Sequence, residues 1–124
     1  MKEKQGGMMK VGIQASKSFD DYSVFMRAMG VALSPLKADA NSLTLYSAGP
    51  VKLNNFVTGF VNLSEDGMKN RGMSIKLYRV APRWLGDNIA DMDYFVYLSR
   101  PNEHWSRITH LADEADIEVG IFQY

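Results

Sequence analysis

Three short stretches of the chain combine hydroxyl, glycine and basic residues directly after an apolar run. In chain order they contain Ser16 and Lys17, then Ser47, Gly49 and Lys52, then Ser99 and Arg100. Hydroxyl groups donate hydrogen bonds to anions, and Lys and Arg add charge-assisted bonds to phosphate or carboxylate. The backbone N–H groups at the start of a helix favour an anion as well. These residue types therefore indicate a site for an anionic group such as phosphate.

The three stretches differ in the charge that surrounds them. Asp20 and Asp21 follow Lys17 in the opening turn of the first predicted helix, where carboxylates repel phosphate and already neutralise the helix dipole. After Lys52 the next acidic residue is Glu65, so no carboxylate close in sequence competes for this lysine. We therefore expect any phosphate to bind nearest the second stretch. The alternative is that all three are ordinary capped helix starts without a ligand.

The sequence offers no recognisable catalytic motif. The carboxylates near the three stretches are Asp20, Asp21, Asp87 and Glu103, and none forms an evident acid–base pair. The chain has no cysteine, which excludes disulfides, thiol catalysis and thiolate metal ligands. His104 and His110 lie six residues apart on one predicted helix, roughly on opposite sides, and make a poor metal pair. We predict no catalytic residue, metal ion or cofactor.

Two further side chains could contact a ligand. Trp84 follows Pro82 and Arg83 in a predicted loop, where its ring could stack on a nucleobase. The alternative is that Trp84 packs on its own domain or on a partner subunit. Arg100 is either a clamp on phosphate or a surface residue, and we favour the clamp.

Alternating strands and helices must position these residues. Strand-like runs occur at 10–15, 42–46, 73–80, 94–98 and 117–123, and apolar residues at helical spacing occur at about 18–33, 50–63 and 101–115. A helical turn is predicted at 88–92, and loops at 64–72 and 81–87. Ser18 and Asp21 suggest a capping box, and Gly59 suggests close packing of a helix on the sheet. The alternation predicts an α/β domain with a parallel sheet and helices on both faces.

The length and the net charge of the chain limit the classes of protein to which it could belong. The 124 residues suit one domain, which we place at 10–124 after a flexible N-terminal tail at 1–9. The 14 basic residues equal the 14 acidic ones, so no global positive field favours nucleic acid as a partner. No apolar run approaches a membrane span or the core of a signal peptide. We expect a cytoplasmic protein that does not bind membranes.

The order of these segments resembles the stand-alone SLOG family of Rossmann-like nucleotide-binding domains. VGIQASKSFDDY is similar to the family's opening V-x-I-x-G-S-R-x-F-x-D-Y, and LYSAGPVKLN falls where the family has a strand and SGGARGAD. GDNIADMDYFVYLSR falls at the family's RN-x-x-M…AD segment, and THLADEADIEVGIFQY is similar to its closing A-x-x-x-G-I-P-V-x-V-Y. The phosphoribohydrolase motif PGG-x-GT-x-x-E is absent, and LSRPNEHW takes its place.

The resemblance implies a Rossmann-like, five-stranded sheet with strand order 3-2-1-4-5. Ligands of such sheets bind outside the carboxyl ends of the strands where the order reverses, here between the first and fourth strands. The three candidate loops are then 15–18, 47–52 and 99–102. Asn88 matches the asparagine of the family's RN segment and joins the candidate ligand residues, although Asp87 replaces the arginine. The resemblance also implies a homodimer, with Trp84, Leu85 and residues 122–124 as contacts.

Three functions are consistent with these observations. The leading hypothesis is a non-catalytic binding module that senses or sequesters a nucleotide or a nucleotide derivative. The first alternative is a nucleotide-processing hydrolase of the phosphoribohydrolase type. The second is a phage or mobile-element accessory protein that acts through contacts with protein or, less favoured, with nucleic acid. The first hypothesis predicts a nucleotide-like small molecule as the partner of the site.

Overall fold

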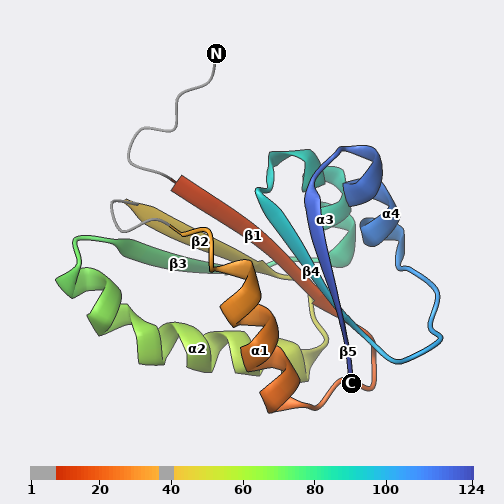
Figure 1. Ribbon diagram of the computed structural model, residues 1–124, viewed down its shortest axis with the longest axis horizontal. Helices are drawn as coiled ribbons and strands as arrows, with labels where there is room; N and C mark the ends of the chain where they lie inside the picture. The colour runs from red at the N-terminus through yellow and green to blue at the C-terminus, as the bar shows by residue number, and fades with distance from the viewer. Residues whose placement is uncertain (1–7, 37–40) are drawn as a thin grey trace.

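Five parallel strands form one sheet in the order β3-β2-β1-β4-β5 (Figure 1). The computed structural model describes residues 8–36 and 41–124. The strands are β1 (Met8–Ala15), β2 (Ser42–Ser47), β3 (Ser74–Arg79), β4 (Tyr94–Ser99) and β5 (Glu118–Gln123). All four neighbouring pairs are parallel, which confirms the strand order that the SLOG resemblance implied.

Helices cover both faces of this sheet, because each connection between parallel strands must cross back over one face. One face carries α1 (Tyr22–Ala32) and α2 (Val51–Asn70). The other carries α3 (Pro82–Asp87), the short 3-10 helix η1 (Ile89–Asp91) and α4 (Arg107–Glu114) (Figure 1). The predicted Rossmann-like α/β class is therefore confirmed. None of the helices in the described ranges has the length and apolar character that a membrane crossing would need.

Strand β1 lies at the centre and contributes to both halves of the core. Successive side chains of a strand point to opposite faces, so Val11 and Ile13 pack in the cluster under α1 and α2. Gly12 faces α3, where a Cβ would lie only 3.0 Å from Cδ1 of Leu85. Glycine at this position allows α3 to approach the strand closely. This contact packs α3 closely against the middle of β1.

Helix α2 and strand β1 are longer than the sequence pattern suggested. Helix α2 continues to Asn70 through the predicted loop at 64–72, because Met68 packs on the core seven residues after Val61. Strand β1 begins at Met8 rather than at residue 10, and it pairs with β2 from its first residue. Residues 1–7 of the expected tail lie outside the described residues.

The two helices on the α3/α4 face also differ from their predicted limits. Helix α3 occupies the predicted loop at 81–87, because the fully buried Leu85 anchors it on the sheet. Helix α4 begins at Arg107 and not near residue 101, since Asn102 has a left-handed backbone with φ of 66°. Trp105, expected in the core, is 44% exposed as a result.

The capping box expected at Ser18 is wrong. The N-cap of α1 is Asp21, whose Oδ1 accepts hydrogen bonds from the backbone N–H of Val24 at 3.1 Å and the hydroxyl of Ser23 at 2.8 Å. Ahead of it, Phe19 is buried and its N–H donates to the Ser16 carbonyl, so the chain makes one more turn before the helix begins. The bonds from Val24 and then Ser23 lower the pKa of Asp21.

We expect Asp21→Ala to lower the unfolding midpoint in urea at neutral pH and Ser18→Ala to change it less, because Asp21 caps α1. The lowered pKa means that the ionised carboxylate stabilises the fold above the ordinary aspartate pKa. This contribution is lost as the pH falls through the lowered value. Urea titrations at neutral and strongly acidic pH should show that Asp21→Ala lowers the unfolding midpoint less in acid. An equal change in midpoint at both pH values would contradict the assignment of Asp21 as the N-cap.

Candidate functional site

The strand order reverses at the carboxyl ends of β1 and β4. The chain leaves β1 towards α1 on one face and leaves β4 towards α4 on the other, so a crevice forms between the two departing segments. Hydrogen bonds fix the end of β1 on both sides: the N–H of Ser16 donates to the Leu98 carbonyl of β4 at 2.9 Å, and that of Ala15 donates to the Gly49 carbonyl after β2 at 3.2 Å. Two neighbouring cavities lie along this crevice.

The first cavity, here called the turn cavity, has a volume of about 470 Å³ and follows the β1–α1 turn. Its lining combines the end of β1, the turn itself, one side chain of β4 and the segment after β4. These residues are Gln14, Ala15, Ser16, Lys17, Ser18, Tyr97, Arg100 and Glu103. The cavity thus brings together the first and third predicted stretches.

Positive charge dominates the turn cavity. Within the described residues, no carboxylate lies within ion-pair distance of Lys17 or Arg100. Glu103 lines the cavity too, but its Oε1 accepts a hydrogen bond from the backbone N–H of Arg100 at 2.9 Å. Burial raises the pKa of Tyr97, with smaller contributions from Glu103 and Tyr124. The Tyr97 hydroxyl therefore stays protonated at neutral pH and can donate a hydrogen bond.

Tyr124 closes the turn from the side of β5. Its hydroxyl contacts the Ser16 hydroxyl and lies 3.0 Å from that of Ser18, while its ring packs edge-on against Phe19 with 5.0 Å between centroids. Its N–H donates to the Ser99 carbonyl at 3.1 Å. Tyr124 therefore fixes the positions of the two serine hydroxyls. No local pattern in the sequence predicts this role.

No residue of the second stretch lines the turn cavity. Lys52 has its Nζ 3.6 Å from Oδ1 of Asp20, so the expectation that no carboxylate competes for this lysine is wrong. The two residues meet because α1 and α2 begin side by side on one face of the sheet. Ser47 is fully buried and its hydroxyl donates to Oδ1 of Asn54 at 2.5 Å. Gly49 has a φ of 88°, which identifies it as a turn residue.

The three remaining candidates have contacts within the fold. Asn88 ends α3, and its Nδ2 donates to the Trp84 carbonyl at 2.9 Å. Trp84 stacks on Tyr46 with ring centroids 5.3 Å apart, and Tyr46 stacks in turn on Tyr78 at 5.5 Å. This is the packing on its own domain that we gave as the alternative to base stacking. Ser99 is buried at the end of β4.

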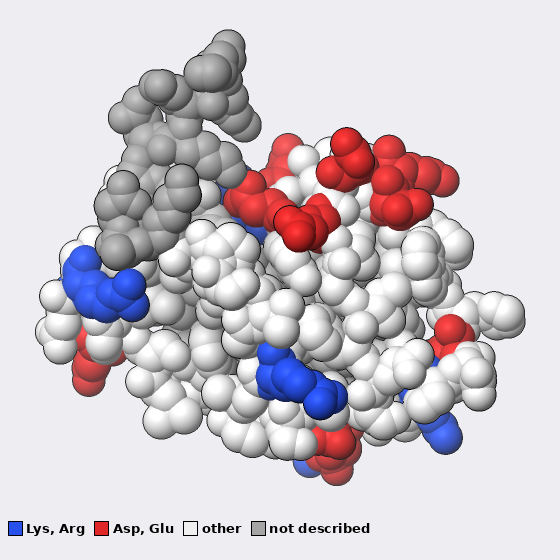
Figure 2. Space-filling view, viewed as in Figure 1, with Lys and Arg blue, Asp and Glu red and all other residues white. Residues whose placement is uncertain are grey.

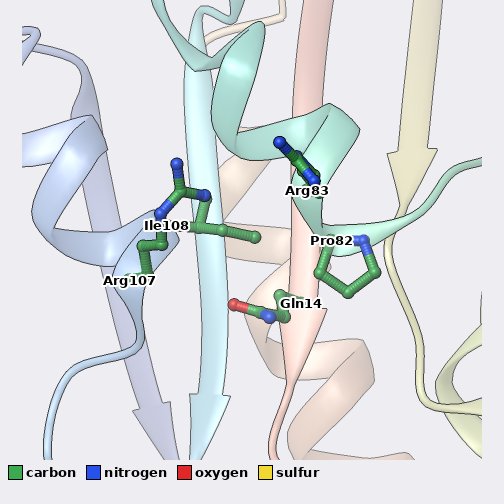
Figure 3. A pocket seen from close by; sticks show the side chains of 5 residues that line it. All are labelled: Gln14, Pro82, Arg83, Arg107 and Ile108. Atoms are coloured by element: carbon green, nitrogen blue, oxygen red, sulfur yellow. The ribbon is translucent and has the colours of Figure 1, made fainter.

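The second cavity, here called the arginine cavity, also has a volume of about 470 Å³ (Figure 3). It lies on the α3/α4 face and is lined by Gln14, Pro82, Arg83, Arg107 and Ile108. Gln14 lines both cavities and joins them at the end of β1. We did not select Gln14, Arg83 or Arg107 from the sequence, although a glutamine inside the apolar β1 run was an available signal.

Acidic side chains gather at the amino end of β5, whereas the two cavities lie near the carboxyl ends of β1 and β4. On the face shown in Figure 2 they lie over the region where α4 ends and β5 begins. The exposed acidic residues of that turn are Asp113, Glu114, Asp116 and Glu118. The described residues include no group of three His, Cys, Asp or Glu side chains that could hold a metal ion. Among the residues that line the two cavities, Glu103 is the one carboxylate.

Comparisons with known proteins do not place the chain in a family. No protein-family model and no curated protein matches the sequence. Among solved structures, the chain is similar to the crystal structure of Mycobacterium tuberculosis shikimate dehydrogenase, with 11% sequence identity and a TM-score of 0.46. The match covers 94% of this chain and 46% of that enzyme, so the chain spans about half of its length.

Two glycine substitutions should change stability in opposite directions. Gly49→Ala should lower the free energy of unfolding by roughly 1–3 kcal/mol, because alanine strains a backbone with positive φ. Gly59→Ala should raise it by up to about 1 kcal/mol, because alanine favours helix and nothing lies within 4 Å of its Cβ. That open space also shows that close packing does not explain Gly59. Urea titration measures both, and a stabilised Gly49→Ala would contradict the turn assignment.

Proposed function

We propose that the chain is a non-catalytic binding module for a nucleotide or a nucleotide derivative, with the ligand in the turn cavity. One observation carries the proposal: a cavity at the β1/β4 switch point is lined by Lys17 and Arg100, and no described carboxylate is paired with either. A concave site with a few convergent polar groups is where small ligands usually bind. The resemblance to the SLOG family supports the same function.

The neighbouring acids do not cancel this positive charge. Asp20 is paired with Lys52, and Asp21 accepts the two hydrogen bonds that cap α1. The repulsion that we expected at the first helix start is therefore weakened. We now place the ligand's phosphate nearest Lys17 and Arg100 instead of Lys52. The neutral Tyr97 hydroxyl would donate a further hydrogen bond to the ligand.

The composition of the cavity also favours binding over hydrolysis. Glu103 is the one carboxylate among the residues that line the cavity, and it accepts a backbone hydrogen bond. General acid–base catalysis of hydrolysis requires a group that moves a proton at the scissile bond, with a pKa suited to that task. For Glu103 the geometry instead supports a structural role in the turn after β4.

We expect Lys17→Ala and Arg100→Ala each to weaken nucleotide binding by about tenfold or more, since a charge-assisted hydrogen bond contributes roughly 1.5–3 kcal/mol. Calorimetric titration with nucleotides and ADP-ribose derivatives measures the change. Lys69→Ala is the matched control, because Lys69 is an exposed lysine in the last turn of α2. Lys52→Ala should have a smaller effect than Lys17→Ala. The opposite order would move the phosphate to the second helix start.

A homodimer stays a prediction. Leu85 is fully buried, so it cannot serve as the contact that we expected. Tyr124 packs on Phe19 but stays partly exposed, so its role as a contact is still a prediction. Trp84 is 41% exposed and keeps a surface that a second copy could cover. Light scattering should give a molar mass in solution of twice that of one chain. The Trp84→Ala variant should give a lower molar mass, closer to that of the monomer. A monomer at high concentration would contradict the prediction.

A further inference from the structure

The two cavities meet at a single side chain. Gln14 is the last residue but one of β1, and it lines the turn cavity as well as the arginine cavity. Its side chain points to the α3/α4 face of the sheet, where Figure 3 shows it beneath Arg83 and Arg107. A ligand that extends past Gln14 from the turn cavity therefore enters the arginine cavity.

The arginine cavity is positively charged. Arg83 comes from α3 and Arg107 from the start of α4, so two separate elements bring guanidinium groups to one cavity (Figure 3). Within the described residues, no carboxylate lies within ion-pair distance of Arg83. Arg107 has Asp87 at 3.8 Å, but both side chains are more than half exposed, and such a pair holds an arginine only weakly. Arg107 also packs over Gly86 of α3, where a Cβ would lie 2.8 Å from the Nη1 of Arg107. Neither arginine is held by a buried carboxylate of the described residues, so both guanidinium groups are available to an anion.

Gln14 adds a requirement for a hydrogen-bond donor between the two cavities. Its Oε1 is buried and accepts no hydrogen bond from any described residue. A buried acceptor without a partner destabilises a fold, and native proteins usually provide one. A hydroxyl or N–H group of a bound molecule lying across Gln14 would supply the missing donor.

We propose that the arginine cavity is a second anion subsite, so that the ligand is a nucleotide with two separated phosphate groups. This inference rests on the proposed function, because the first phosphate occupies the turn cavity beside Lys17 and Arg100. The second phosphate binds Arg83 and Arg107, and a hydroxyl or N–H of the intervening sugar or base donates to Gln14. A nucleoside bisphosphate and a cyclic dinucleotide share this chemistry, whereas a nucleoside monophosphate and a diphosphate do not.

Calorimetric titration of the full chain with four probes tests the inference. The probes are the 5′-monophosphates, the 5′-diphosphates, the 3′,5′-bisphosphates and the cyclic dinucleotides of adenosine and guanosine. We expect a bisphosphate or a cyclic dinucleotide to bind at least about tenfold tighter than the corresponding monophosphate and diphosphate. Which of these two binds tighter identifies the source of the second phosphate.

Variants then assign the second phosphate to the arginines. Arg83→Ala and Arg107→Ala should each remove most of the preference for separated phosphates, whereas affinity for the monophosphate should stay within about twofold. Gln14→Leu should also reduce the preference, because it removes the acceptor. Arg71→Ala is the matched control: Arg71 is exposed at the end of α2, away from both cavities.

The possible results separate the two proposals. Equal affinity for all four probes, or a preference that survives both arginine substitutions, overturns the second subsite and leaves the proposed function standing. The second subsite is also overturned if Arg71→Ala reduces the preference for separated phosphates as much as Arg107→Ala does. The electrostatic field of charges spread over the protein, and not contact with the arginine cavity, would then explain the preference. Failure of every probe to bind overturns both proposals.

Discussion

Parallel pairing of β1 on both of its sides is the constraint on which the candidate site depends. Near the end of β1, the Ile13 carbonyl accepts from the N–H of Ala48, and the Ser16 N–H donates to the Leu98 carbonyl, both at 2.9 Å. Beyond these bonds the chain must leave the sheet, and right-handed crossovers send α1 and α4 to opposite faces. The crevice between them is a consequence of the strand order and needs no special loop.

The distribution of charge gives this crevice its chemical character. Asp20 is paired with Lys52 and Asp21 caps α1, so the two acids that follow Lys17 in the chain are both engaged. A further acidic group lies at the α4–β5 turn, at the other edge of the sheet. The chain has no net charge, yet each of the two cavities is lined by two cationic side chains and by at most one carboxylate. The fold thus places positive charge at the cavities, although the composition of the whole chain has no excess of it.

Sequence reasoning succeeded where the signal was local and periodic. The apolar run of β4 becomes a strand with every residue buried, and alternation of strands and helices was sufficient for the α/β class. It failed where distant residues meet. The Lys52–Asp20 pair joins two helix starts, and the contact between Tyr124 and Ser16 joins residues 108 positions apart. Neither contact has a local pattern in the sequence, so the ion pair of Lys52 and the contact of Tyr124 with the β1–α1 turn could not be predicted.

Amide chemical shifts would test the switch-point site most directly. In a nitrogen-15 labelled sample titrated with a nucleotide, the account predicts that the backbone amides of Ser16, Lys17 and Arg100 shift most, together with the side-chain amide of Gln14. The amides at 51–54, at the start of α2, should shift far less, since they line neither cavity. Shifts concentrated at 51–54, or no saturable shifts around residues 14–18, would contradict the account.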